Sequence, residues 1–460
     1  MRPDKPNFED KGQESLHQSS KSAGRQVGEV SALSSDGRGI VHSREKIYFA
    51  ERVVPGDRVA FSANDTAKPP IAEQVKVLRK STDRCEHPCR HAKECPASEW
   101  GIISYEKQLS EKTELVRRVL RGVVSPAVVA EMWPSPSKWG YRNRLTLQLR
   151  GRERGGADLG YAVGARGAGF AEIRNCLLGT KTVGQALGNV GWALRDAREL
   201  PKSSFPDRIS FYETDWGAGL IAIFKGSPDE TDVQNFLKFA RIFEVPGGVW
   251  IGTANLAGVV GERGRFWREE ESRSMLTTWL GKDLSVHPAG FAQVNEGATH
   301  LVLEHLQEQR ERLSARTVWD LYGGYGALGF AAAVDGARVE VVEQNALSKK
   351  TFEHLAAMNP SVEAEFHQGE VARLLPRLSE TFSPDDLVIL DPPRSGCHPS
   401  VLKLLGDSRI KRIAYLSCNP ARLSRDLKIL ATDGFQAVQI QPVDFFPQTP
   451  EIEALAMLER

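Results

Sequence analysis

Residues 317–343 read TVWDLYGGYGALGFAAAVDGARVEVVE, and this stretch decides the fold class. An apolar strand leads into a glycine-rich turn, a helical run and a second apolar strand, which is typical of a doubly wound, Rossmann-like α/β sheet. Gly324, Gly326 and Gly329 satisfy G-x-G-x-x-G, and such glycines let the backbone approach a ligand closely. Glu343 ends the second strand, where a carboxylate can accept both hydroxyls of a ribose. These features predict a nucleotide-like cofactor, either NAD or S-adenosylmethionine.

Two later strand ends narrow the choice. Asp391-Pro-Pro-Arg394 follows the apolar run DLVIL, and Ser417-Cys-Asn-Pro420 follows RIAYL. Ligands of open α/β sheets bind outside the carboxyl ends of the strands, so these segments and the glycine loop should converge on one crevice. A lone cysteine just past a strand is usually a small buried hydrophobe. Next to Asn-Pro and opposite Asp-Pro-Pro, Cys418 is better interpreted as an exposed residue of the crevice than as a packing residue.

At these residues the chain resembles the RNA uracil-5-methyltransferase family, whose members place 5-methyluridine in ribosomal or transfer RNA. The resemblance covers about residues 25–460. Its motifs occur in order: Phe291-x-Gln293-Val-Asn295, Asp320-Leu-Tyr-Gly-Gly, Glu343, Asp391-Pro-Pro-Arg, Ser417-Cys-Asn-Pro and Asp444-Phe-Phe-Pro-Gln-Thr-Pro-Glu-Ile-Glu453. The resemblance implies S-adenosylmethionine as cofactor and an RNA uridine as substrate, with ribosomal RNA favoured over transfer RNA.

The resemblance also implies roles for individual residues. Four would contact the cofactor: Gln293, Tyr322, Glu343 and Asp391. Glu370, at the expected end of the following strand, is a further cofactor candidate. Cys418 would be the nucleophile and Glu453 the base. A solvated surface carboxylate is the alternative interpretation of Glu453.

The chemistry explains why these residue types are needed. C5 of uracil is a poor nucleophile, but a thiolate that adds to C6 gives C5 carbanion character. C5 can then take a methyl group, and a base removes the C5 proton so that the thiolate is eliminated. Because a duplex would hide C6, the target uridine must be single-stranded or flipped out of its stack.

Upstream of this region the composition changes several times. Residues 1–24 mix charges with Ser, Gly, Pro and Gln, which predicts a disordered tail. Residues 25–80 hold short β-like runs broken by turns, which predict a small barrel. They look like the TRAM domain of the family, which implies an RNA-holding barrel of the oligonucleotide-binding kind. Residues 81–280 predict a central α+β domain with a cysteine cluster and an RNA-binding surface, and residues 281–460 the methyltransferase domain.

The cysteine cluster lies at the start of the central domain, directly after the barrel. In a reducing compartment such a cluster suggests a metal or iron–sulfur centre rather than disulfides. The candidate ligands are four cysteines: Cys85, Cys89, Cys95 and Cys176. The family's centre is [4Fe–4S], but Ser98 stands where its third cysteine is expected, and Cys85 is the extra residue that could replace it. His87 and His91 leave zinc open, and an empty, degenerate site is the third alternative.

The chain departs from the family pattern at two further positions, and it also contains a basic segment. The family usually has Cys where this chain has Gly323, and His where it has Glu451; neither change removes a reacting group. The segment Trp139-Gly-Tyr-Arg-Asn-Arg144 sets aromatics beside arginines, as expected for stacking on bases and pairing with phosphates of single-stranded RNA. A solvated basic strand is the alternative.

The net charge and the lack of long apolar stretches limit the remaining classes of protein. A formal net charge of +1 carries no signal for nucleic acid, so any such signal must be local. The N-terminus lacks a secretory signal and no apolar stretch is long enough to span a bilayer, which predicts a cytoplasmic protein without membrane partners, and we expect a monomer. Two rivals stay open: an NAD-dependent oxidoreductase, and a non-catalytic RNA-binding protein with a degenerate methyltransferase domain.

Overall fold

The computed structural model divides the chain into two compact units. One comprises Met1–Ala32 and Gly39–Ser81, and the other comprises Leu33–Arg38 and Thr82–Arg460. The residues that the structure describes are 25–44, 46–163, 169–226, 228–240, 245–246, 248–254, 265–267 and 275–460. The predicted disordered tail, residues 1–24, therefore lies outside the described residues.

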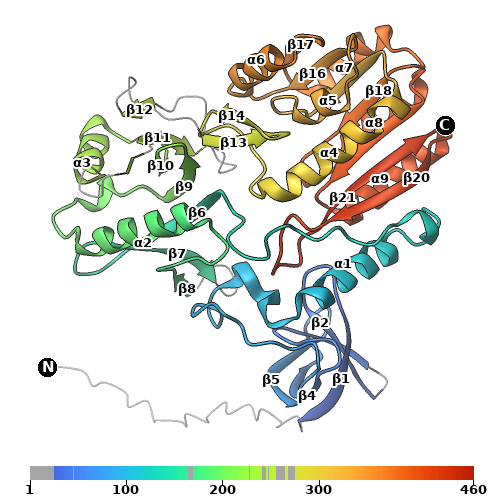
Figure 1. Ribbon diagram of the computed structural model, residues 1–460. Coiled ribbons are helices and arrows are strands. Elements are labelled where there is room, and N and C mark those ends of the chain that lie inside the picture. The colour runs from blue at the N-terminus through green and yellow to red at the C-terminus, as the bar shows by residue number, and fades with distance from the viewer. Residues whose placement is uncertain are drawn as a thin grey trace, which may run out of the picture. The chain divides into compact units, whose positions relative to one another are not determined.

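The first unit is built on a closed barrel with the strand order β1-β2-β3-β5-β4 (Figure 1). Its strands are β1 Gln26–Leu33, β2 Gly39–Ser43, β3 Lys46–Ala50, β4 Arg58–Asn64 and β5 Ile71–Arg79. Alternate residues of these strands point inward, among them Val30, Val41, Tyr48 and Phe61, which pack into one core. The prediction of a small N-terminal barrel is confirmed, and its bounds at residues 25 and 80 stay a prediction.

The central part of the second unit is α+β, as predicted. A seven-stranded sheet has the order β12-β11-β10-β9-β6-β7-β8, and β13 pairs with β14 separately. The strands are β6 Arg144–Gly151, β7 Ala157–Val163, β8 Gly169–Glu172, β9 Arg208–Thr214, β10 Gly217–Lys225, β11 Val249–Ala254, β12 Arg265–Trp267, β13 Met275–Trp279 and β14 Lys282–Val286. Helices α2 Lys181–Asp196 and α3 Glu230–Ala240 share a core with this sheet through Leu187, Phe236 and Phe211.

The C-terminal part is the predicted doubly wound sheet, with the order β17-β16-β15-β18-β19-β21-β20. Strands β15 to β19 run parallel, and β21 is antiparallel to both β19 and β20. The strands are β15 Thr317–Leu321, β16 Arg338–Glu343, β17 Glu363–Gln368, β18 Leu387–Leu390, β19 Arg412–Ser417, β20 Gln436–Val443 and β21 Glu453–Glu459. Runs such as LVIL in β18 are wholly buried because helices cover both faces of the sheet.

The helices around this sheet belong to two separate hydrophobic cores. One core includes α1 Tyr105–Val119, α7 Val371–Leu378, α8 Pro399–Asp407 and α9 Pro420–Thr432. The other includes α4 Glu296–Leu313, α5 Ala327–Ala332 and α6 Ser348–Met358. No helix in the described part of the chain is long and apolar enough to cross a membrane. The predicted boundary at residue 281 stays a prediction, because the central and C-terminal parts belong to the same compact unit.

Candidate active site

The predicted cofactor and catalytic residues gather at the carboxyl edge of the parallel strands. Strands β15 to β19 each end at this edge, as parallel strands of one sheet must. The residues at or just past these ends are, in chain order, Tyr322, Glu343, Glu370, Asp391 and Cys418. The sequence prediction of one common crevice therefore agrees with the topology.

Strand β21 brings Glu453 beside Cys418. In the antiparallel pairing of β19 with β21, Ser417 is opposite Ala454, so the residues just beyond this pair, Cys418 and Glu453, are also neighbours. Glu453 is only 4% exposed, and its Oε2 has no hydrogen-bond partner among the described residues. Burial, followed by the nearby Asp391 carboxylate, raises the pKa of Glu453 well above its usual value. The alternative interpretation of Glu453 as a solvated surface carboxylate is wrong.

The surroundings of the two C-terminal cysteines differ. Cys418 is half-buried, and burial, then Glu453 and Asp391, raise its pKa to about 11, while Arg394 acts in the opposite direction. Cys397 is only 2% exposed, and burial raises the pKa of its thiol far above the usual range. Cys418 therefore has the more accessible thiol of the pair.

The glycine loop between β15 and α5 holds Glu343 in place. The backbone N–H of Gly324 donates to Glu343 Oε2 at 3.1 Å, and that of Asn345 donates to Oε1 at 2.7 Å. Tyr322 has a φ of 62°, a left-handed conformation that costs a non-glycine residue about 1–3 kcal/mol and is concentrated at functional sites. A Cβ on Gly323 would lie 2.6 Å from Asp320 Cγ, so this loop has no room for the side chain that the family usually carries there.

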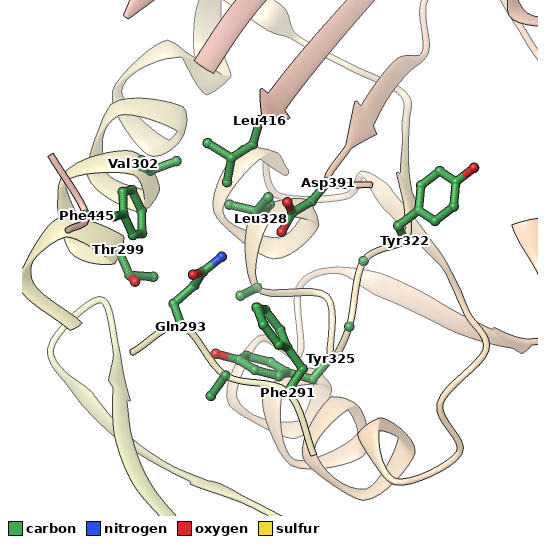
Figure 2. Close-up of a pocket in the computed structure, with 14 residues that line it drawn as sticks. Phe291, Gln293, Thr299, Val302, Tyr322, Tyr325, Leu328, Asp391, Leu416 and Phe445 are labelled. Carbon is green, nitrogen blue, oxygen red and sulfur yellow. The ribbon is translucent and has the colours of Figure 1, made fainter. Parts of the chain in front are cut away.

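A pocket opens beside this loop (Figure 2). Of the predicted cofactor residues, Gln293, Tyr322 and Asp391 line it. Figure 2 shows the Gln293 and Asp391 side chains turned toward the pocket and the Tyr322 ring turned away from it. Burial, followed by Glu343, raises the pKa of Asp391 to about 7, so its carboxyl group can donate as well as accept a hydrogen bond near neutral pH.

The pocket also contains side chains that the sequence analysis did not single out. These lining residues include Thr299, Val302, Tyr325, Leu328 and Leu416. Tyr325 lies inside the glycine motif, and from this position the sequence could have predicted that its side chain lies near the ligand. Thr299 lies in the first turn of α4, shortly after the Gln293–Asn295 motif. The sequence around Thr299 has no feature that predicts a contact with the ligand.

The segment Tyr141–Arg144 holds the site together instead of lying open to RNA. The Tyr141 hydroxyl donates to the Pro447 carbonyl at 3.1 Å, and the ring is only 5% exposed. The Arg144 guanidinium donates to the carbonyls of Pro288 (2.7 Å) and Gly290 (3.0 Å). The prediction that these two side chains contact RNA is wrong, because their polar groups already bind the backbone of segments at the active site.

The four predicted metal ligands differ in burial: Cys95 is buried, Cys89 and Cys176 are half-buried, and Cys85 is exposed. Thiolates on one zinc ion at about 2.3 Å must lie about 4 Å apart. Among the described residues, no three cysteine and histidine ligand atoms come within 4.8 Å of one another. A preassembled zinc site is therefore not present in the described part of the chain. His87 Nε2, not Cys85, lies next to Ser98, 3.3 Å from its Oγ.

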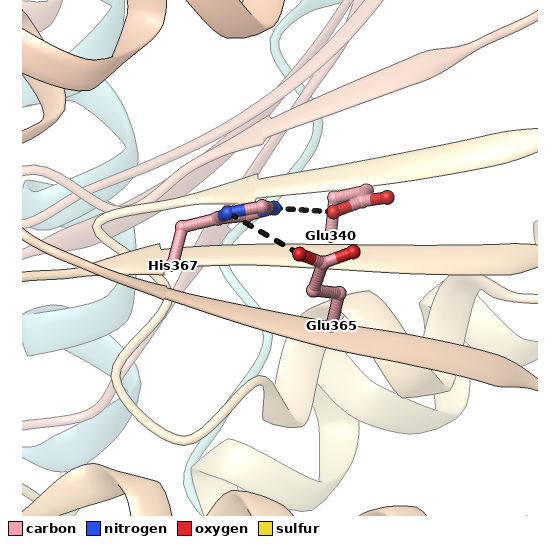
Figure 3. Close-up of side chains that lie close together, drawn as sticks. All are labelled: Glu340, Glu365 and His367. Atoms are coloured by element: carbon pink, nitrogen blue, oxygen red, sulfur yellow. Dashed lines mark hydrogen bonds and ion pairs between the residues drawn. The ribbon is translucent and has the colours of Figure 1, made fainter.

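A different group of possible ligands lies on β16 and β17: Glu340, Glu365 and His367 (Figure 3). Arg338 forms ion pairs with Glu340 and Glu365, so a cation from the protein already balances these carboxylates. The group lies within the strands and not at their carboxyl ends. We interpret it as a cross-strand ion network.

Comparisons with known proteins agree with this geometry. A family model described as tRNA (Uracil-5-)-methyltransferase matches residues 287–460. The chain is 28% identical over 452 residues to an uncharacterized RNA methyltransferase of Synechocystis sp., covering 94% of each chain. It is 26% identical to an uncharacterized RNA methyltransferase of Thermotoga maritima, covering 93% of this chain and 98% of the other. The crystal structure of Pyrococcus abyssi tRNA (uracil-54, C5)-methyltransferase in complex with S-adenosyl-L-homocysteine matches with a TM-score of 0.70 and 22% identity, covering 94% of this chain and 100% of that chain. This last likeness shows a shared fold.

Proposed function

We propose that this chain is a member of the RNA uracil-5-methyltransferase family and methylates C5 of an RNA uridine through a covalent bond between Cys418 and C6. The observation that carries the proposal is the pairing of β19 with β21, which sets the thiol of Cys418 beside the buried carboxyl group of Glu453. The oxidoreductase alternative is wrong, because the family model and the curated relatives are methyltransferases.

Each reacting side chain has one step. The Cys418 thiolate adds to C6, and the electron pair of the C5–C6 double bond moves to C5 and its neighbouring carbonyl. S-adenosylmethionine, when bound, supplies the electrophilic methyl group that C5 takes. Glu453 then removes the C5 proton, the double bond re-forms and the bond from C6 to sulfur breaks. A carboxylate whose pKa is raised by burial is a stronger base once it is ionised.

The remaining crevice residues would hold the two substrates. Glu343 would accept hydrogen bonds from the ribose of the cofactor, in place of the two backbone N–H groups that it binds here. Gln293, Tyr322 and Glu370 would contact the rest of the cofactor, and Asp391 would contact the cofactor and the edge of the uracil. The pocket beside the glycine loop supports the assignment of Gln293, Tyr322 and Asp391, which line it, whereas Glu343 and Glu370 are assigned from their places at the strand ends.

The test of the proposal is methylation of RNA taken from cells that lack the protein. The purified chain with S-adenosylmethionine should form 5-methyluridine at a discrete position, and mapping that position decides between ribosomal RNA, which we favour, and transfer RNA. The Pyrococcus abyssi neighbour is a tRNA methyltransferase, so both RNAs belong in the assay. Absence of 5-methyluridine would favour the non-catalytic RNA-binding alternative.

We also propose a [4Fe–4S] cluster bound by Cys89, Cys95, Cys176 and Cys85. Cys95 and Cys176 pack against the same hydrophobic core, and Cys89 is near enough to Cys176 to contribute to its raised pKa. Protein purified without oxygen should be brown and contain iron and sulfide. Stoichiometric zinc, or no metal, would refute this.

A further inference from the structure

A buried polar network lies behind the segment that carries Asp391. Asp426, on α9, is fully buried, and its Oδ2 accepts hydrogen bonds from the Tyr415 hydroxyl at 2.7 Å and the Cys397 N–H at 3.0 Å. The Arg425 Nε donates to Asp426 Oδ1 at 2.6 Å, and another guanidinium nitrogen donates to the Cys397 carbonyl at 3.0 Å. The carboxylate and guanidinium therefore bind both backbone groups of one residue, Cys397.

The backbone of this segment lies directly on the ion pair. Gly396 has a φ of +79°, and a Cβ there would lie 2.7 Å from the Arg425 guanidinium and 2.8 Å from Asp426 Oδ2. Only glycine combines this conformation with so close an approach. The ion pair thus fixes the end of residues 391–397.

The same helix fixes the nucleophile. Asn419, the residue after Cys418, caps the N-terminus of α9, where its Oδ1 accepts from the N–H groups of Ala421 and Arg422. Its Nδ2 donates to the Arg394 carbonyl at 3.2 Å. Helix α9 therefore binds the 391–397 segment twice, at its N-cap Asn419 and about two turns later at Arg425 and Asp426, and carries Cys418 at its start.

The fixed segment places a cation among the reacting groups. The Arg394 guanidinium pairs with Glu451 at 3.0 Å, and Glu451 is two residues before Glu453. The charged groups around Cys418 are Glu453 on β21 and, after β18, Asp391 and Arg394. Both carboxylates disfavour the thiolate, and Arg394 favours it.

We propose that Asp426 is a positioning residue for the methyl transfer, which acts with Arg425 to hold Arg394 and Asp391 at a fixed place opposite Cys418. The inference rests on the proposed function. Burying a charged pair costs folding free energy unless its hydrogen bonds are satisfied, and two apolar side chains of similar volume would pack equally well in its place. Here the side-chain hydrogen bonds that the pair makes to other residues go to Cys397 at the end of the 391–397 segment and to Tyr415 on β19, the strand that immediately precedes Cys418.

The experiment compares Asp426→Asn and Arg425→Met with Ser424→Ala. Ser424 is the matched control, because it is a buried polar residue of the same helix whose hydroxyl donates instead to the Val119 carbonyl at 3.1 Å. The readouts are the Kd of S-adenosylmethionine, thermal stability, and the rate at which RNA containing 5-fluorouridine forms a covalent adduct at neutral and alkaline pH.

We expect both network variants to lower the adduct rate at neutral pH at least about tenfold, with the Kd of the cofactor changed less than about twofold. Their pH profiles should move to higher pH, because a displaced Arg394 no longer favours the thiolate. Ser424→Ala should match the wild type. If Asp426→Asn does not fold, Arg425→Met decides, since its side chain is 36% exposed.

Three results would overturn the inference. Wild-type adduct rates in both variants would show that the network does not position the segment. A slower rate with an unchanged pH profile, accompanied by loss of cofactor affinity and thermal stability, would assign Asp426 to general folding. If the wild-type protein formed no adduct at all, the proposed function itself would fail, a result distinct from the other two.

Discussion

Glu343 is the single residue whose loss should be seen most directly in cofactor binding. Replacing it with alanine removes the acceptor for the ribose hydroxyls, and hydrogen bonds to a charged group contribute about 1.5–3 kcal/mol. We expect the Glu343→Ala variant to bind S-adenosylmethionine at least about tenfold more weakly in calorimetry. Glu363→Ala, an exposed carboxylate at the far end of neighbouring β17, is the control. Unchanged affinity would remove Glu343 from the site.

The Cys418 thiol should give the reaction a steep pH dependence. Its pKa is raised to about 11, so the thiolate fraction grows about tenfold per pH unit throughout the neutral range. We expect the rate of adduct formation with 5-fluorouridine RNA to rise from neutral to alkaline pH. A rate independent of pH would mean that the thiolate forms by another route, such as a proton transfer that substrate binding completes.

The sequence can nominate single residues where chemistry restricts the residue type. From their motifs we predict Cys418 as the nucleophile, Glu453 as the base and Glu343 as the ribose carboxylate, and these three roles stay predictions. Burial could not be predicted in the same way. Tyr141 and Arg144 are residue types that are common on RNA-binding surfaces, but their side chains donate hydrogen bonds to backbone carbonyl groups of segments distant in sequence. Asp426 was missed because one acidic residue in an amphipathic helix gives no signal.

At the scale of elements, the glycine loop should not tolerate the residue that the family usually has. A Cβ at position 323 would lie 2.6 Å from Asp320 Cγ and 2.7 Å from its backbone oxygen, so the loop must move. We therefore expect Gly323→Cys and Gly323→Ala to weaken binding of S-adenosylmethionine, by about tenfold if the shift costs one ligand hydrogen bond.

The control for this loop is Gly151→Ala at the end of β6, where an added Cβ meets nothing within 4 Å. A Gly323→Cys variant that binds the cofactor as tightly as the wild type would show that the loop adopts another conformation when occupied.

The order of elements was predictable in part. Alternating apolar and helical runs predicted the parallel strands β15 to β19, because that signal is local. The place of β21 between β19 and β20 is set by pairing between segments far apart in sequence, and this pairing is what brings Glu453 to Cys418. Glu453 was therefore predicted as the base from a motif, and its proximity to the thiol is seen in the structure.

At the scale of the whole molecule, a fully buried ion pair joins α1 to the segment that precedes the base. Lys112 Nζ donates to Asp444 Oδ1 at 2.6 Å and to the Phe446 carbonyl at 3.0 Å, and neither charged side chain is exposed. Because 332 positions separate the two residues, no local pattern could have predicted the pair.

Removing one partner should be far more harmful than removing both. Lys112→Met leaves a buried carboxylate without its cation, which we expect to lower the free energy of unfolding by about 3–5 kcal/mol in urea. The double variant Lys112→Met, Asp444→Leu should recover much of this loss, because no unpaired charge remains. A single variant as stable as the wild type would show that the pair does not hold the two segments together.

The central claim, covalent catalysis by Cys418 with Glu453 as base, is tested most directly by trapping the RNA adduct on a denaturing gel and mapping the cross-linked peptide. Glu453→Gln should add the thiolate and transfer the methyl group but release product slowly, so the adduct should accumulate. RNA with 5-fluorouridine at the target should trap the wild-type enzyme at Cys418, and Cys418→Ala should form no adduct. Methylation of C5 by Cys418→Ala, or an adduct on the buried Cys397, would contradict the mechanism.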